Sequence, residues 1–320
     1  MLMDAGLMVV GLVVLVIGAD VLVRGASTIA QKLGVRPAVV GLTVVAWGTS
    51  FPELMISVQA SLGGYADLAI GNVVGSNFYN ITLIVGLSAL ISGLNVQRET
   101  LRLDLPAMLA ATLAFWLVAI DRSFSQIEGA LFVVALIGFT GLVLWQMPPE
   151  GSPITSGFHR KPAEARRKGW KHAMWPVWAI GSFLVGVVFL GYGARWFTDG
   201  AVHIAETLGV SKRVIGLTLV ALGTSLPELA TSIVAALRGH ADIAVSNVVG
   251  SNLLNILVIV GVAAMIKPID VSETVLNLDM PMLLAISVLF AIFLRTERRV
   301  TRLEGFILLA LGVGYTLWLI

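Results

Sequence analysis

The sequence predicts an all-α membrane protein whose ten transmembrane helices form two inverted repeats of five helices each. Three observations support this prediction. The composition is strongly apolar, because 57% of the 320 residues are hydrophobic and only 12% are charged, with a mean hydropathy of +0.92. The apolar residues lie in long stretches, and the second half of the chain repeats the first. This composition excludes a water-soluble globular enzyme, a disordered chain and a nucleic-acid-binding module.

Ten apolar stretches are expected to cross the membrane as helices, since a spanning helix needs about 20 mostly apolar residues. They are continuous and rich in Leu, Ala and Gly, whereas a membrane β-barrel would alternate apolar and polar residues. The first stretch is expected to be a retained span rather than a signal peptide, because Asp4 is the only charged residue before Gly18. The expected spans are residues 5–24, 37–62, 68–97, 104–121, 129–149, 173–194, 213–237, 243–266, 279–294 and 305–320.

Basic residues predict the orientation of these spans. Residues 146–175 form a long polar linker that carries six Arg and Lys residues, so the positive-inside rule places it in the cytoplasm. The linker separates a first five-helix repeat, residues 1–145, from a second, residues 176–320. An even number of spans puts both termini on the same side. We therefore expect a multi-pass protein of the cell (inner) membrane with both termini outside.

The internal repeat is strongest between residues 41–87 and 216–262, which match without a gap at well over half of their positions. The motif GTSFPEL in the first copy becomes GTSLPEL in the second, and GNVVGSN becomes SNVVGSN. Because five spans is an odd number, the second copy enters the membrane upside down. Inverted repeats are typical of transporters, whose substrate site lies near the midplane where the repeats meet.

Each repeat places one glutamate, Glu53 or Glu228, inside an apolar stretch. A charged residue at the centre of a spanning helix costs about 2.5–3.5 kcal/mol on insertion scales, so it normally faces a cavity or a partner. No Lys or Arg lies within a helical turn of either glutamate. A bound cation is the expected partner, and a protonated, hydrogen-bonded structural glutamate is the alternative.

The residues around the glutamates supply further oxygen atoms. Pro52 lacks an N–H, so it releases the carbonyl of Gly48 and is expected to loosen the turn around Ala46. A carbonyl freed inside a membrane needs another partner, and cations are suitable ones. The second repeat has the same arrangement at Pro227, Gly223 and Ala221. Hydroxyl groups on the same helix faces as the glutamates belong to Thr49, Ser50, Thr224 and Ser225.

A second polar stripe recurs every four residues on the next helix of each repeat. It comprises Asn72, Ser76 and Asn80 in the first copy, with Asn247, Ser251 and Asn255 in the second. One such residue in a span is commonly a contact between helices. Two identical stripes, each following a helix that carries a glutamate, favour a polar site instead.

All of these groups offer oxygen as the ligand atom. The chain has no Cys, and its four His residues lie outside the stripes. Hard oxygen ligands suit Ca²⁺, and by extension Na⁺, and argue against zinc and copper. Mg²⁺ is less expected because it prefers to keep several of its waters.

The paired motifs resemble the two alpha repeats of the sodium/calcium exchanger family, within the cation/calcium antiporters. The central linker, residues 146–175, is short and basic and leaves no room for the long regulatory calcium-binding domain of animal exchangers, so the chain resembles a prokaryotic-type member. The resemblance implies antiport by alternating access, with Glu53 and Glu228 as central calcium ligands and with hydroxyls and carbonyls at flanking sodium sites. The metal ligands that it implies are Ala46, Thr49, Ser50, Glu53, Ser76, Asn80, Ala221, Thr224, Ser225, Glu228, Ser251 and Asn255.

One of these positions separates the chain from some members of that family. They carry Asp where this chain has Asn255, so the site here has two acids rather than three. This weakens any coupling to potassium and leaves the ion stoichiometry open.

These features predict a secondary-active antiporter that exchanges Ca²⁺ for Na⁺ and is not an enzyme, with no cofactor. The sequence has no P-loop, so an ion gradient must supply the energy. The nearest alternative is an antiporter of protons for Ca²⁺, or for another divalent cation, with the same two glutamates. A passive channel is a third possibility, and the lack of GxSxG and HExxH motifs argues against an intramembrane enzyme. Small inorganic cations and the lipid bilayer are the expected partners, without nucleic acid or an obligate protein partner.

Overall fold

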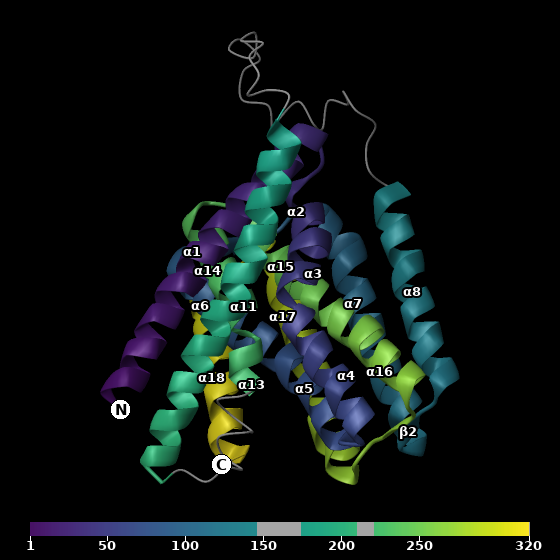
Figure 1. Cartoon of the computed structure of the whole chain (residues 1–320). Helices are drawn as coiled ribbons and strands as arrows, with labels where there is room; N and C mark the ends of the chain where they lie inside the picture. Colours follow the sequence, from purple (N-terminus) through teal and green to yellow (C-terminus); the bar gives the residue numbers. More distant parts are fainter. Residues whose placement is uncertain (146–173, 210–220, 320) are drawn as a thin grey trace.

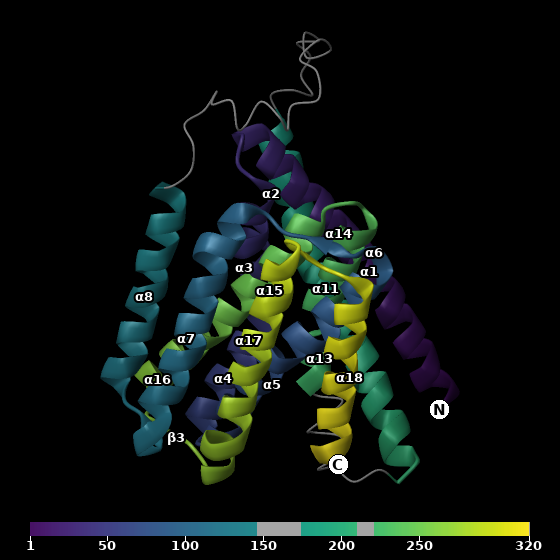
Figure 2. The same ribbon diagram turned by 180° about the vertical axis from the view of Figure 1, so that it is seen from behind.

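The computed structural model describes residues 1–145, 174–209 and 221–319, and this part of the chain is a helical bundle (Figure 1). The two termini lie at one end of the bundle. The last turn of α8 (Gln126–Trp145) and the first turn of α11 (Trp175–Thr207) lie at the other end (Figures 1 and 2). The predicted linker between them, residues 146–175, lies almost entirely outside the described residues.

The elements follow one another in a similar order in the two halves. The η segments are wider π-type turns that continue the neighbouring α-helices, except η4, which is a single 3₁₀ turn. The first half contains α1 (Leu2–Leu33), α2 (Pro37–Val40), η1 (Gly41–Val45), α3 (Ala46–Thr49), α4 (Phe51–Gly63), α5 (Ala66–Tyr79), η2 (Asn80–Val85), α6 (Gly86–Ser92), β1 (Leu94–Asn95), η3 (Thr100–Asp104), α7 (Leu105–Val118), η4 (Ala119–Asp121), β2 (Ser123–Phe124) and α8. The second half contains α11, α13 (Ala221–Thr224), α14 (Leu226–Leu237), α15 (Ala241–Leu254), η7 (Asn255–Val260), α16 (Gly261–Ile266), β3 (Ile269–Asp270), η8 (Val275–Asp279), α17 (Met280–Thr296), β4 (Arg299–Val300) and α18 (Arg302–Leu319).

Seven helices in the described ranges are long and apolar enough to cross a membrane, and the bent pair Pro37–Thr49 and Phe51–Gly63, which meets at 47°, adds an eighth. This confirms a multi-pass helical membrane protein. The span expected at 213–237 includes residues outside the described ranges and is represented by α14, with 12 residues. The span expected at 305–320 corresponds to α18, with 18 residues. The count of ten therefore stays a prediction.

α1 and α11 are the longest described helices, with 32 and 33 residues, and they extend well beyond the expected spans. They pack against each other on one side of the bundle (Figure 1). Glycine makes this contact possible, because a Cβ atom at Gly193 would lie 2.6 Å from the backbone nitrogen of Leu15. A Cβ atom at Gly186 would lie 2.7 Å from the backbone nitrogen of Leu22. The two backbones are therefore too close for any larger residue at these positions.

The helices that carry the Asn and Ser stripes occupy the centre of the bundle. The apolar windows of Leu68–Ser92 and Ala241–Ile266 are 72% and 83% buried, whereas those of the other five single spans are 22–39% buried. The outer helices expose Leu, Val and Ile side chains, as a lipid environment allows. The polar stripes are thus shielded from lipid by the rest of the bundle.

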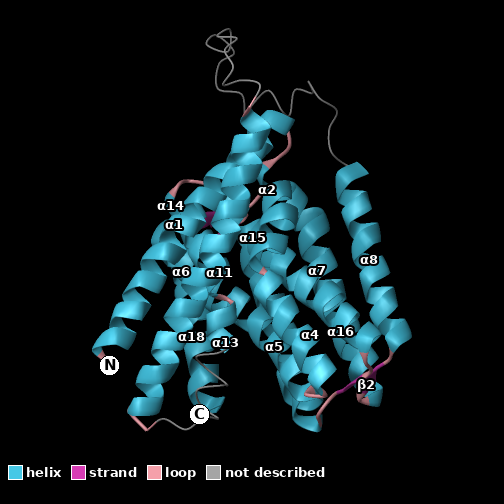
Figure 3. Cartoon of the chain, in the orientation of Figure 1, coloured by secondary structure: helices cyan, strands magenta, loops and turns pink. Residues whose placement is uncertain are grey.

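Two pairs of short strands join the halves of the chain near opposite ends of the bundle (Figure 3). β1 pairs with β4, so that Leu94 lies opposite Val300. β2 pairs with β3, so that Phe124 lies opposite Ile269. Each pair takes one strand from each half, so both ends of the bundle are tied across the two halves.

Candidate ion-binding site

Each of the two buried glutamates follows a break in its helix. Ser50 (φ −83°, ψ 6°) separates α3 from α4, and Ser225 (φ −87°, ψ 3°) separates α13 from α14. Each new helix has a proline at its second position and the glutamate at its third. Proline is tolerated there because a backbone N–H at that position would have no intrahelical partner. The start of a helix carries a partial positive charge, which stabilises a carboxylate there. The sequence thus places Glu53 and Glu228 at matching helix starts.

The two helix breaks contact each other across the halves of the chain. Ser50 Oγ donates a hydrogen bond to Glu228 Oε1 (2.9 Å), and Ser225 Oγ donates one to Glu53 Oε1 (3.4 Å). Both glutamates are 1% exposed, and their carboxylates are close enough to interact electrostatically. Neither forms an ion pair with a basic side chain of the described ranges. The structure therefore brings two acids together without a protein cation between them.

The asparagine side chains of α5 and α15 are also joined across the halves. Asn80 Nδ2 donates to Asn252 Oδ1 (2.9 Å), and Asn255 Nδ2 donates to Asn77 Oδ1 (2.9 Å). Each bond uses the amide nitrogen of a predicted ligand and so fixes which way its oxygen points. Asn77 and Asn252 are not among the predicted ligands. Each is the last residue of its repeated motif, GNVVGSN or SNVVGSN, but its role depends on how the two helices face each other.

A further pair of asparagines holds the glutamate helices in place. Asn72 Nδ2 donates to Ser57 Oγ (2.9 Å) and to the Glu53 carbonyl (3.2 Å). Asn247 Nδ2 makes the matching contact with Ser232 Oγ (3.2 Å). Neither serine is among the residues predicted from the sequence, although each follows its glutamate by four residues and so lies on the same helix face.

Six oxygen atoms of the predicted ligands are buried without a hydrogen-bond partner, and each half of the chain supplies three of them. Buried polar groups are normally satisfied, and a serine in an apolar helix commonly donates to the carbonyl four residues earlier. Ser76 and Ser251 do not form such a bond. The six atoms are Glu53 Oε2, Ser76 Oγ, Asn80 Oδ1, Glu228 Oε2, Ser251 Oγ and Asn255 Oδ1.

The remaining predicted ligands lie at the ends of α3 and α13. Thr49 is buried, and its hydroxyl lies 3.2 Å from the carbonyl of Val45 and 3.3 Å from that of Ala46. The Ala46 carbonyl also accepts a hydrogen bond from the Ser50 nitrogen (2.9 Å), so the turn around Ala46 is closed and not loosened as expected. In the second half, Ala221 begins α13, and Thr224 is buried at its end.

The chemistry of the site is that of oxygen ligands alone. Within the described ranges, no group of three or more His, Cys, Asp and Glu side chains could hold a metal ion. A cation bound here would therefore contact two carboxylates together with neutral hydroxyl, amide and carbonyl oxygens. That donor set suits hard cations such as Ca²⁺ and Na⁺.

Comparison with known proteins identifies the family. The family described as "Sodium/calcium exchanger protein" matches residues 3–145 and, a second time, residues 178–320. The chain belongs to the sodium/calcium exchanger family. Members of this family are antiporters rather than enzymes, and the chain is a helical membrane protein of this type.

Several relatives align with this exchanger-family chain over nearly its whole length. The putative antiporter CaxA of Alkalimonas amylolytica is 36% identical, with 98% of each chain covered. The sodium/calcium exchanger MaX1 of Methanosarcina acetivorans is 34% identical, with 97% of this chain and 96% of MaX1 covered. Among solved structures, the sodium-calcium exchanger NCX_Mj is 30% identical and superposes with a TM-score of 0.83, covering 98% of this chain and 97% of NCX_Mj.

Proposed function

We propose that this exchanger-family chain moves Ca²⁺ in exchange for Na⁺ and binds the ions between its two halves. The observation that carries the proposal is the set of six buried oxygen atoms without partners, three from each half. Leaving such atoms unsatisfied is costly, and a bound cation would satisfy all of them. Six ligands fall within the 6–8 oxygens that Ca²⁺ takes. Two carboxylates balance the charge of one divalent ion.

The same pair of carboxylates accounts for exchange rather than co-transport. Ser50 and Ser225 each donate to the glutamate of the other half. Na⁺ ions at the flanking hydroxyls and carbonyls would draw on the same carboxylate charge that holds Ca²⁺. Occupation by one kind of ion therefore disfavours the other, and each crosses the membrane in turn.

Alternating access follows if residues 1–145 and 176–320 are inverted repeats of five spans each. In the repeat alignment β1 corresponds to β3, and β2 to β4, so the pairs β1–β4 and β2–β3 are equivalent contacts at opposite ends of the bundle. Arg122 and Arg298, which precede β2 and β4, are the non-glycine residues of the described chain with positive φ, at 67° and 54°. The separate matches of the family to each half also support the duplication.

Reconstituted transport tests this function. The purified protein in liposomes should take up ⁴⁵Ca²⁺ when an outward Na⁺ gradient is imposed at clamped pH, and uptake should saturate. Glu53→Gln and Glu228→Gln should abolish uptake, whereas Glu297→Gln, which alters an exposed acid paired with Arg299, should not. Uptake driven by a pH gradient without Na⁺ would support the proton antiporter instead. Full activity in both site variants would refute the site.

We also propose that the protein lies in the cell membrane with residues 146–175 in the cytoplasm and both termini outside. Arg36 directly precedes α2, which lies toward the end of the bundle opposite the termini (Figure 1), in keeping with the positive-inside rule. The absence of native Cys allows single cysteines to report sidedness. In intact cells, a membrane-impermeant maleimide should label Leu2→Cys, which precedes the first span and is exposed, and spare Arg98→Cys, which lies exposed between two spans. The reverse pattern would overturn the orientation.

A further inference from the structure

Asp104 is a buried acid whose counterpart in the second half, Asp279, has a hydrogen-bond partner that Asp104 lacks. Asp104 precedes α7, and the equivalent Asp279 precedes α17. Tyr315 donates a hydrogen bond from its hydroxyl to Asp279 Oδ1 (2.7 Å). Aligning Glu128-Gly129 with Glu304-Gly305 places Phe139 at the position of Tyr315. Phenylalanine has no hydroxyl, so the first half of the chain cannot repeat this bond.

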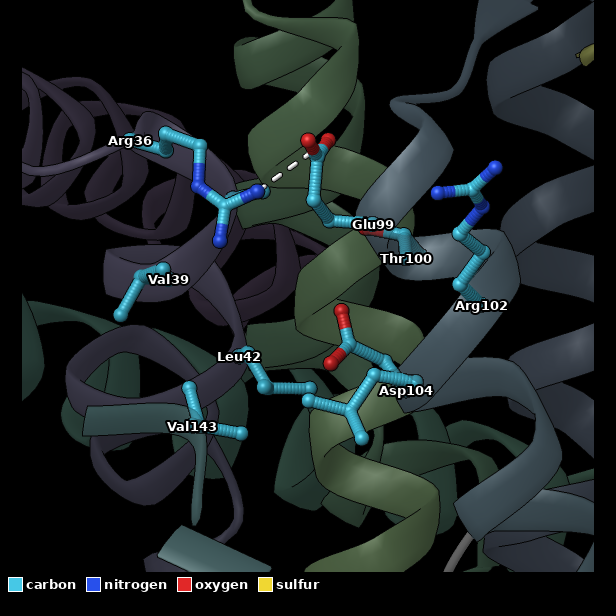
Figure 4. Close-up of a pocket in the computed structure, with 10 residues that line it drawn as sticks. Arg36, Val39, Leu42, Glu99, Thr100, Arg102, Asp104 and Val143 are labelled. Carbon is cyan, nitrogen blue, oxygen red and sulfur yellow. Dashed lines mark ion pairs between the residues drawn. The ribbon is translucent and has the colours of Figure 1, made fainter. Parts of the chain in front are cut away.

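Asp104 instead faces a cavity of about 160 Å³ at the end of the bundle away from the termini (Figure 4). The side chain is 7% exposed, and its carboxylate points toward the space below Arg36 and Glu99. The Thr100 hydroxyl interacts with that carboxylate. A single water needs only about 15 Å³, so the cavity has room for a small organic group.

The charges around this cavity are of both signs and are only partly paired. Arg36 forms an ion pair with Glu99 (3.1 Å), which leaves the Nε of Arg36 buried and without a partner. Arg102 lies at the rim beyond Glu99 (Figure 4). In the described part of the chain no ion pair includes Arg102 or Asp104, although the Asp104 carboxylate interacts electrostatically with Arg36. A ligand that pairs with these charges therefore carries a positive group next to Asp104 and a negative group next to Arg102.

The cavity opens beside an apolar helix surface. Val143 of α8 lines it, and the same helix exposes Ile137 (65%), Leu144 (52%) and Trp145 (83%). Exposed tryptophan at the end of an apolar helix is typical of the interface between lipid tails and headgroups. Arginines in cavities between membrane helices at that level bind the phosphates of lipid headgroups.

We propose that this cavity binds the headgroup of phosphatidylethanolamine. The primary ammonium donates hydrogen bonds to the carboxylate of Asp104, and the phosphate contacts the guanidinium groups of Arg102 and Arg36 that line the cavity. The acyl chains lie along the exposed face of α8. Choline lipids lack N–H donors and so cannot bind Asp104 in this way, and phosphatidylglycerol has no cation for it. The proposal involves neither Glu53 nor Glu228 and does not depend on the ion site.

Native mass spectrometry of the detergent-purified protein tests this assignment with ethanolamine, choline and glycerol phospholipids of identical acyl chains. The wild type should retain the ethanolamine lipid roughly tenfold better than the choline lipid, the scale of one charge-assisted hydrogen bond. Asp104→Asn should remove the preference. Phe139→Tyr, which supplies the hydroxyl present in the second half, should reduce it, and Asp279→Asn should leave it unchanged. Melting temperatures confirm that each variant is folded.

Three results would overturn the proposal. Equal retention of ethanolamine and choline lipids by the wild type would mean that the ammonium is not recognised. Preferential retention of phosphatidylglycerol would assign the cavity to its arginines alone. Displacement of the lipid by an equal concentration of free O-phosphoethanolamine would show that the headgroup chemistry is right and that a lipid is the wrong source.

Discussion

Replacing Asn252 by alanine should weaken calcium binding without removing a proposed ligand. Asn252 Oδ1 accepts the hydrogen bond from Asn80 Nδ2 (2.9 Å) that aims the Asn80 oxygen. The backbone carbonyl of Asn252, which accepts from Asn77 Nδ2 (3.3 Å), is retained in the variant. The substitution therefore releases one amide group and leaves the neighbouring contact in place.

The size of the effect follows from the environment of Asn80, which is 1% exposed. A buried donor left without a partner costs about 1–3 kcal/mol, and rotation of the amide relieves this by turning the oxygen away from the site. Since about 1.4 kcal/mol corresponds to a factor of ten, the apparent affinity for Ca²⁺ should fall about 10- to 100-fold. Losses of this size are typical when residues that orient metal ligands are removed.

The concentration dependence of Na⁺-driven ⁴⁵Ca²⁺ uptake in liposomes measures this change. Asn77→Ala, which releases Asn255 in the same manner, should give a similar shift. Asn277→Ala alters an exposed asparagine and serves as the control. If Asn252→Ala folds and keeps the wild-type calcium dependence, Asn80 is not a ligand oriented by its partner, and this reasoning about the site is wrong.

Two further predictions concern the stability of the bundle. Gly193→Leu should lower the melting temperature and abolish transport, because its side chain meets the backbone of Leu15 and overpacking costs about 1–3 kcal/mol. Gly191→Leu, where no atom lies within 4 Å, should melt like the wild type, and equal melting of the two variants would refute the close contact of α1 and α11. Ser125→Ala should destabilise the start of α8 by about 0.5–2 kcal/mol, because Ser125 and Glu128 cap the helix through reciprocal hydrogen bonds. Thermal unfolding followed by tryptophan fluorescence measures this loss, and an unchanged transition would contradict the capping role.

The internal repeat made most of the site predictable. Once Glu53 and Glu228 occupied matching positions in two copies, a site between the copies was the natural inference, and the structure places both acids within one hydrogen-bonded group. The stripes of Ser and Asn were predictable for the same reason. Spacing along one helix shows which side chains share a face, and the duplication indicates that two such faces meet.

Features that depend on contacts between distant helices could not be predicted. Asn77 and Asn252 each accept a hydrogen bond from an asparagine of the other half. These bonds depend on how α5 is rotated relative to α15, which no local pattern specifies. The strands have two residues each and thus no detectable alternation. Pro52 was expected to loosen the turn around Ala46, yet the break occurs at Ser50, after the Ser50 nitrogen has closed that turn by a hydrogen bond to the Ala46 carbonyl.

The exchange of strands between the halves has a consequence for how such a chain arises and assembles. Neither half holds both members of a pair, so a half expressed alone leaves a main-chain edge open at each end. The other half of the chain supplies the missing member at both ends at once. Two separate polypeptides divided within residues 146–175 should therefore fold only when they are made together.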